Sequence, residues 1–146
     1  QPGAHTGTFR GNQIAMKAGS IVLERVSAPA FLDEVTRKGK KIMGRMNSIK
    51  EKVSIIGDVR GRGLMIGCEF VNPKGQADCT GLFPANGDAA GAVQKLCFEN
   101  GLIMERGGRN GSVMRSLCPL SVTDEEIDLA MDIFDSAVLK VNEEYN

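Results

Sequence analysis

The sequence of 146 residues has one histidine, one tyrosine and no tryptophan. With His5 as the single histidine and no CxxC pair among the four cysteines, a zinc centre or other metal site is not expected. No serine or cysteine pattern beside His5 suggests a nucleophile and its base. We therefore expect a positional or packing role for His5 rather than a catalytic one.

Net charge and long apolar runs are also absent. The 18 basic residues balance the 18 acidic ones, so composition does not suggest nucleic acid or an anionic membrane as a partner. No apolar run approaches the length of a membrane span, and the polar opening lacks the plan of a signal peptide. Cys68, Cys97 and Cys118 lie within apolar patterns, which predicts buried, reduced thiols and a cytoplasmic location.

The first half of the sequence predicts two helices. Apolar residues recur at helical spacing over residues 13–26. A second helix is expected to start at Ser27 or Ala28, with Pro29 in its first turn and an apolar stripe that continues to Ile49. Two successive helices of this kind indicate a connecting arm more than a compact unit.

From residue 57 onward the pattern predicts the order strand, strand, helix, strand, strand, helix. The four strands are expected at residues 58–60, 64–71, 102–105 and 112–117. Asp88 is expected to cap a helix that runs to Asn100, after a loop at residues 72–87. Thr123 and Glu126 form a capping box before the last helix. Short connections favour antiparallel pairs with helices packed on one face, which is an α+β sandwich.

Two glycine-rich segments look like ligand-binding motifs, yet turns explain them better. Residues 61–67 fail as a dinucleotide fingerprint, because the third glycine comes one place late and a strand follows. Residues 106–109, Arg-Gly-Gly-Arg, are a weak indication of RNA or phosphate binding in a neutral chain. We expect tight turns at residues 61–63 and 106–111, and the second could also be a mobile turn near an active site.

Thr8 and Arg115 are the strongest candidates for site residues. The hydroxyl of Thr8 and the N–H groups of Thr8 and Phe9 precede a helix start, where anions such as phosphate bind well. The alternative is that Thr8 only starts the helix. Arg115 lies in a mostly apolar strand, so its guanidinium must be paired or face a cleft. It would form either a salt bridge with a nearby carboxylate or a bidentate clamp on a substrate carboxylate.

Three segments together resemble the class III, pyridoxal-phosphate-dependent aminotransferases. Residues 5–12 (HTGTFRGN) resemble the H-x-[GS]-T-[FY]-x-G-N segment of that family, and residues 58–67 (DVRGRGLMIG) resemble its V-R-G-x-G-L-M-x-G hairpin. Residues 115–120 (RSLCPL), followed by residues 123–128, resemble its R-x-x-P-P-L ending and final helix. The order and spacing of the three segments also agree. Within the family, the variant at residues 2–13 is most similar to the 2,4-diaminobutyrate:2-oxoglutarate branch.

The resemblance implies a fold and roles for single residues. The chain would be the small C-terminal domain of a fold-type I enzyme, preceded by linking helices. Gly7, Thr8 and Phe9 would contact the phosphate of pyridoxal 5′-phosphate bound by the neighbouring subunit of a homodimer. Arg115 would hold the α-carboxylate of the amino acid or 2-oxoacid substrate. Arg10, where many members have glycine, fits the diaminobutyrate branch, and Cys118, where many have proline, does not threaten the role of Arg115.

The family's Schiff-base lysine lies a few tens of residues before the threonine motif, and this chain begins too late to contain it. We therefore expect no catalytic residue here, and no activity from the chain alone. Residues 1–50 would be the tail of the large domain with the linking helices, and residues 51–146 the small domain. The parent enzyme would move an amino group from L-2,4-diaminobutyrate to 2-oxoglutarate. The alternative is a freestanding, non-catalytic α+β domain that binds a small carboxylate or mediates association.

Overall fold

The computed structural model describes residue 3 and residues 6–145 and divides into two compact units, residues 1–34 and residues 35–146. We call them the N-terminal and the C-terminal unit. His5 lies outside the described residues. In the N-terminal unit, helix α1 (Gln13–Val26) has the predicted bounds, and none of its residues is buried. The guanidinium of Arg25 stacks over the ring of Phe31, 5.6 Å from its centroid, which stabilises the corner between α1 and the next helix.

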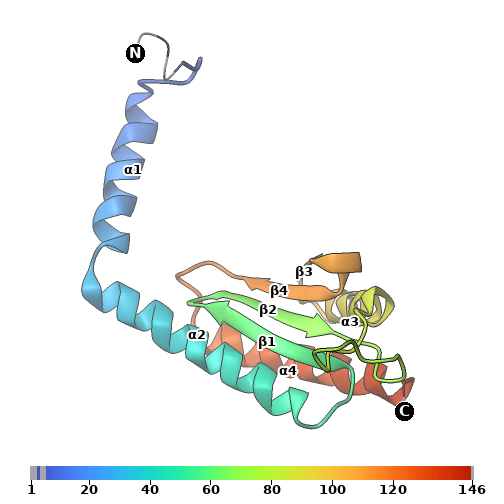
Figure 1. Cartoon of the computed structure of the whole chain (residues 1–146). Helices are drawn as coiled ribbons and strands as arrows, with labels where there is room; N and C mark the ends of the chain where they lie inside the picture. The colour runs from blue at the N-terminus through green and yellow to red at the C-terminus, as the bar shows by residue number, and fades with distance from the viewer. Residues whose placement is uncertain (1–2, 4–5, 146) are drawn as a thin grey trace. The chain divides into compact units, whose positions relative to one another are not determined.

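The C-terminal unit is the predicted α+β fold. Its elements are residues 35–50 of α2 (Pro29–Lys50), β1 (Ile56–Arg62), β2 (Met65–Phe70), α3 (Gly87–Glu99), β3 (Glu105–Gly107), the 3-10 helix η1 (Arg109–Gly111), β4 (Val113–Leu117) and α4 (Asp124–Glu143). The strands form one sheet in the order β1-β2-β4-β3, in which every neighbouring pair is antiparallel. Figure 1 shows α3 and α4 on the same side of this sheet.

The core lies between the helices and one face of the sheet. In β2, the buried residues Ile66, Cys68 and Phe70 alternate with Met65, Gly67 and Glu69, which point the other way. This alternation follows from the pleat, which turns successive side chains to opposite faces. The helices complete the core with Ile42, Met46 and Ile49 of α2, Val93 and Cys97 of α3, and Ile127, Met131, Phe134 and Val138 of α4.

The helix that was expected to be capped by Asp88 begins earlier, because Asn86 is the N-cap of α3. The Asn86 side-chain oxygen accepts a hydrogen bond from the N–H of Ala89 at 3.0 Å, which places Asp88 inside the first turn. The other end agrees with the prediction, since Asn100 is the C-cap and Gly101 follows with φ +89°.

Two strand and turn predictions are wrong in their bounds. Residues 102–104 are not part of a strand: the Met104 carbonyl accepts a hydrogen bond from the Gln94 side chain at 2.9 Å, and β3 spans residues 105–107 instead. The expected turn at residues 61–63 is displaced, because β1 continues to Arg62, which pairs with Met65. Gly63 and Leu64 are thus the two-residue loop, with Gly63 at φ +55°. The turn expected at residues 106–111 is shared between β3 and η1.

The cysteines follow the prediction in part. Cys68 and Cys97 are buried, Cys118 is half-buried, and Cys79 is exposed; all four are free thiols. Burial raises the pKa of Cys68 to about 12 and that of Cys97 to about 11, so both stay protonated at neutral pH. Among the described residues no helix is both long and apolar enough to cross a bilayer.

The start of α4 is fixed twice, by a cap and by ion pairs. The Glu126 carboxylate accepts from the N–H of Thr123 at 2.8 Å, and the Thr123 hydroxyl accepts from the N–H of Glu126 at 3.2 Å, which confirms the predicted capping box. Asp124, the next residue, is 2.6 Å from the guanidinium of Arg37 and 3.2 Å from the ammonium of Lys41, both on α2. These two cations hold the pKa of Asp124 well below its usual range.

We predict that Thr123→Ala lowers the free energy of unfolding by about 1 kcal/mol, because one helical N–H loses its acceptor. Urea unfolding of the chain at neutral pH measures this loss. Thr123→Ser is the matched control, since it keeps the hydroxyl, and it should stay within a few tenths of a kcal/mol of the wild type. Equal destabilisation by both variants would contradict the cap as the cause.

We also predict that the stabilisation by Asp124 depends on pH. A carboxylate whose pKa is lowered in the folded state stabilises the fold above the pKa of the unfolded chain, about 3.9, and loses that contribution as pH falls further. The urea midpoint of the wild type should therefore exceed that of Asp124→Asn at neutral pH, and the gap should close below about pH 4. Asp88→Asn is the control, because Asp88 occupies a first helical turn without an ion pair to any described residue. A gap that is independent of pH would refute the ion pairs as its source.

Candidate functional site

The face of the sheet that the helices do not cover carries most of the charged side chains of the strands. Direct register partners point to the same face, so one row crosses all four strands: Arg60 of β1, Gly67 of β2, Arg115 of β4 and Glu105 of β3. We call this surface the open face. Its central position, Gly67, has no side chain, and Cγ1 of Val113 would lie 3.1 Å from a Cβ atom added there.

Arg115 lies on this open face because its neighbours in β4 belong to the core. Met114 and Ser116 are buried, so the pleat turns Arg115 outward, where 36% of its side chain is exposed. Its Nη2 is 2.8 Å from the Glu105 Oε1. Within the described chain, Glu105 is the one carboxylate that pairs with it. The ion pair that the sequence left open as an alternative is therefore present, on an accessible surface where a substrate carboxylate could also reach the guanidinium.

The guanidinium of Arg115 lies against Gly107. A Cβ atom at position 107 would be 2.4 Å from Nη2, 2.8 Å from Cζ and 3.1 Å from Nε of Arg115. The Nε atom itself is buried and has no hydrogen-bond partner among the described residues. One edge of the guanidinium is thus covered by β3, while the rest of the group remains partly exposed.

The other arginine of the row is already neutralised. Arg60 Nη1 is 2.8 Å from the Asp58 carboxylate and 2.6 Å from that of Glu69, and these hydrogen bonds raise the pKa of Arg60. Both carboxylates contact the same nitrogen, and together they outweigh the single positive charge of Arg60, which disfavours the approach of another anion. Arg115, with a single partner, is the better anion site of the two.

The predicted phosphate-contact residues belong to the N-terminal unit, whereas Arg115 belongs to the C-terminal unit. Gly7 to Arg10 form a turn closed by a hydrogen bond from the Arg10 N–H to the Gly7 carbonyl at 3.3 Å. The N-cap of α1 is Asn12, whose side-chain oxygen accepts from the N–H of Ala15 at 2.9 Å, so Thr8 does not cap the helix. Thr8 and Phe9 are exposed, and their N–H groups donate to no carbonyl of the described chain. The turn therefore presents to an anion a hydroxyl and two N–H groups that have no carbonyl acceptor among the described residues.

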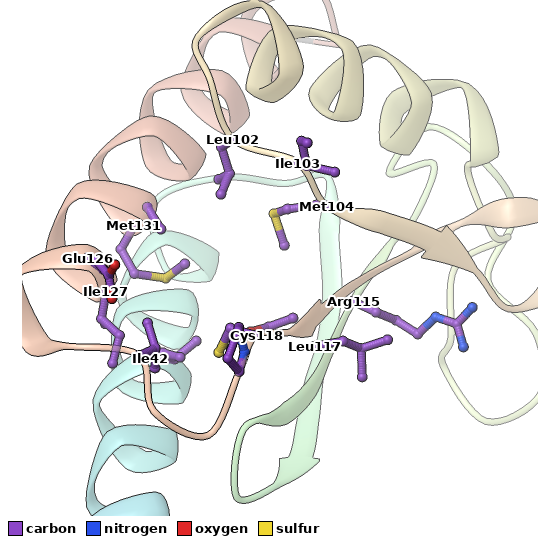
Figure 2. A pocket seen from close by; sticks show the side chains of 14 residues that line it. Ile42, Leu102, Ile103, Met104, Arg115, Leu117, Cys118, Glu126, Ile127 and Met131 are labelled. Atoms are coloured by element: carbon purple, nitrogen blue, oxygen red, sulfur yellow. The ribbon is translucent and has the colours of Figure 1, made fainter. Parts of the chain in front are cut away.

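One hollow of the C-terminal unit is mostly apolar. It has a volume of about 270 Å³ and lies between the end of β4, the segment before β3 and the helices α2 and α4. Figure 2 shows Ile42, Leu102, Met104 and Met131 around it, and the guanidinium of Arg115 points away from it. Arg115 is one of the residues that line the hollow, although its guanidinium points out of it, so the hollow adjoins the anion site.

The environment of Lys41 does not favour nucleophilic chemistry. Lys41 contacts Asp128 at 2.8 Å and Asp124 at 3.2 Å, and the hydrogen bond to Asp128 is the main cause of its raised pKa. A nucleophilic lysine needs the opposite shift, toward the neutral amine. No group of three or more side chains that could hold a metal ion occurs among the described residues.

Sequence reasoning singled out Arg115 and missed the two residues of β3 that contact it. Glu105 was assigned to the end of a strand and Gly107 to a turn, so neither was expected beside the guanidinium. Their spacing of two, which puts both on one face of a strand, was the available signal. This spacing identifies the two residues as neighbours on one face only when the bounds of β3 are known.

Comparison with known proteins places this geometry in a family. The profile of the class-III aminotransferases matches residues 1–138. A diaminobutyrate–2-oxoglutarate aminotransferase of Haemophilus influenzae is 37% identical over 139 residues, which cover 95% of this chain and 31% of that protein. The protein of the same name from Rhizobium meliloti is 44% identical over 128 residues, which cover 88% of this chain and 27% of that protein. The chain thus spans less than a third of the length of these relatives.

Solved structures agree with the sequence relatives. An aminotransferase from Bacillus anthracis superposes with a TM-score of 0.78 at 26% identity, over 94% of this chain and 30% of that chain. The adenosylmethionine-8-amino-7-oxononanoate aminotransferase of Methanocaldococcus jannaschii gives a TM-score of 0.73 at 29% identity, over 94% of this chain and 30% of its own. A family match over nearly the whole chain, together with this fold, means that the chain belongs to the class III aminotransferases.

Proposed function

We propose that this chain is the C-terminal part of a pyridoxal-phosphate-dependent aminotransferase that moves an amino group from L-2,4-diaminobutyrate to 2-oxoglutarate. The observation that carries the proposal is Arg115, a partly exposed guanidinium with one carboxylate partner on the open face of the sheet. Two relatives at 37% and 44% identity bear the name of this reaction, which supports the choice of substrates. In this proposal residues 1–50 link to the large domain, residues 51–146 are the small domain, and the enzyme is a cytoplasmic homodimer.

The residues present fit the cofactor at one point, its phosphate. The turn at Thr8 has an exposed hydroxyl and two N–H groups without an acceptor in the described chain, and such donors bind phosphate. Gly7, Thr8 and Phe9 would contact the phosphate of the cofactor held by the neighbouring subunit. Bound pyridoxal phosphate supplies the electron sink for moving the amino group.

Arg115 would supply orientation. A guanidinium binds the α-carboxylate of the amino acid or the 2-oxoacid through two parallel hydrogen bonds, which fixes the position and the rotation of the substrate. The positive charge does not change during the reaction, so Arg115 binds substrate and transition state alike. Its loss should therefore raise KM more than it lowers kcat.

We predict that Arg115→Met in the full-length enzyme raises KM for 2-oxoglutarate at least about tenfold, because a charge-assisted bidentate contact is lost. Steady-state kinetics at saturating diaminobutyrate measure this change. Arg62→Met is the matched control, since Arg62 is an exposed arginine of the same sheet. An unchanged KM in Arg115→Met, or equal effects of the two variants, would remove Arg115 from the substrate site.

For the chain alone we predict no transaminase turnover and no covalent capture of the cofactor. Borohydride reduction in the presence of pyridoxal phosphate, followed by mass spectrometry, should find no single lysine labelled stoichiometrically. Full labelling of one lysine together with turnover of 2-oxoglutarate would show that the chain carries its own catalytic lysine.

The freestanding, non-catalytic domain is tested by the same preparation. Calorimetric titration with 2-oxoglutarate should give no saturable binding if the chain is part of a larger site. Saturable binding that Arg115→Met abolishes, with no lysine labelled, would favour the carboxylate-binding domain instead.

A further inference from the structure

We propose that Gly107 and Glu105 of β3 are positioning residues for Arg115, which together hold its guanidinium in the orientation that receives a substrate carboxylate. The inference rests on the proposed function, because it assigns Arg115 to the substrate. It adds two residues that act through Arg115 and touch no substrate themselves. We call the surface formed by Glu105 and Gly107 the β3 seat.

The register of the sheet brings the three residues together. Glu105 is the direct partner of Arg115 and Gly107 is the direct partner of Val113, so both seat residues lie on the open face with the guanidinium. Their spacing of two along β3 repeats the spacing of Val113 and Arg115 along β4. A shift of this register by one residue would turn Glu105 and Gly107 to the core side and dismantle the seat.

Gly107 acts through the volume that it leaves empty. With a Cβ atom at 2.4 Å from Nη2 and 2.8 Å from Cζ, any side chain at position 107 collides with the guanidinium. The guanidinium therefore lies where a side chain would otherwise be, directly on the β3 backbone. Nε, 3.1 Å from the position of such a Cβ atom, is buried and has no hydrogen-bond partner in the described part of the chain. The carboxylate of a substrate must then approach from the Nη side.

Glu105 acts through its charge and its reach. Its Oε1 holds Nη2 at 2.8 Å, and half of its side chain is exposed. One ion pair at this exposure does not neutralise the guanidinium strongly, but it limits rotation about the last bonds of a long side chain. A restrained guanidinium loses less conformational entropy when a substrate binds.

The two roles make a prediction about binding that charge alone does not make. Removing a carboxylate beside Arg115 raises the local positive potential, which by itself would tighten the binding of an anion. If Glu105 positions the guanidinium, its removal weakens binding instead. The sign of the change in KM therefore separates positioning from charge repulsion.

The kinetic test uses the full-length enzyme with glutarate as a competitive inhibitor and 2-oxoglutarate as the substrate. Gly107→Ala should raise both the inhibition constant for glutarate and KM for the 2-oxoacid about tenfold, with kcat changed by less than about threefold. Glu105→Ala should raise both constants several-fold, and Glu105→Gln, which keeps an oxygen at the same reach, should restore most of the affinity. A fall in KM in Glu105→Ala, or unchanged constants in Gly107→Ala, would overturn the seat.

Two control variants distinguish an effect through Arg115 from a general loss of folded structure. Gly44→Ala adds a Cβ atom that meets nothing within 4 Å outside its own helix, so it should leave the inhibition constant and KM unchanged. Glu99→Gln removes an ion-paired carboxylate whose exposed fraction, 52%, equals that of Glu105. Changes in either control as large as those in the seat variants would attribute the effect to the fold rather than to Arg115.

A spectroscopic test on the chain itself does not depend on the proposed function. In the ¹H–¹⁵N NMR spectrum, the Nε–Hε signal of Arg115 should exchange slowly with water, because Nε is covered. Gly107→Ala should accelerate that exchange, and Gly44→Ala should not. Fast exchange in the wild type would contradict the seat. If the NMR result holds while Arg115→Met leaves KM unchanged, the proposed function fails and the seat stands as structure alone.

Discussion

Burial of a single face of the four-stranded sheet is the constraint on which the C-terminal unit depends. The helices α2, α3 and α4 cover one side, and the side chains that point there, Ile66, Cys68, Phe70 and Met114, are fully buried. Because a strand alternates strictly, each buried residue fixes the outward direction of its neighbours. The open face can then carry charged side chains without the desolvation cost that a second packed layer would impose. The apolar pattern that builds the core thereby also determines which side chains are presented outward.

The position of Arg115 follows from this constraint. Its position between Met114 and Ser116 forces the guanidinium out of the core, and the antiparallel pairing with β3 places Glu105 and Gly107 beside it. Arg60, two strands away in the same row, has the same charge but is paired with two carboxylates, Asp58 and Glu69. The two arginines differ in the number of carboxylates that contact them, which is two for Arg60 and one, within the described chain, for Arg115. A carboxylate is therefore expected at Arg115.

Much of this architecture could be predicted from the sequence. The order of elements, the antiparallel sheet, the bounds of α1 and the capping box at Thr123 follow from local patterns and are present. The errors lie where one side-chain hydrogen bond, or the pairing of two strands, decides the outcome. The Gln94 side chain donates to the Met104 carbonyl, and β3 begins only at the next residue. The Asn86 side chain accepts from the N–H of Ala89, so Asn86 rather than Asp88 is the cap. The seat for Arg115 was missed for the same reason, because it depends on the register of two strands. The roles of Thr8 and Arg115 came from the resemblance to the family, and they stay predictions.

The central claim is that the open face of this domain receives the carboxylate of the substrate at Arg115. A crystal structure of the full-length enzyme with glutarate bound measures this most directly. The claim predicts one carboxylate of glutarate within hydrogen-bond distance of the Arg115 guanidinium, on the edge that Gly107 leaves uncovered, with Glu105 still beside Nη2. Glutarate bound elsewhere, with Arg115 paired to Glu105 alone, would contradict it.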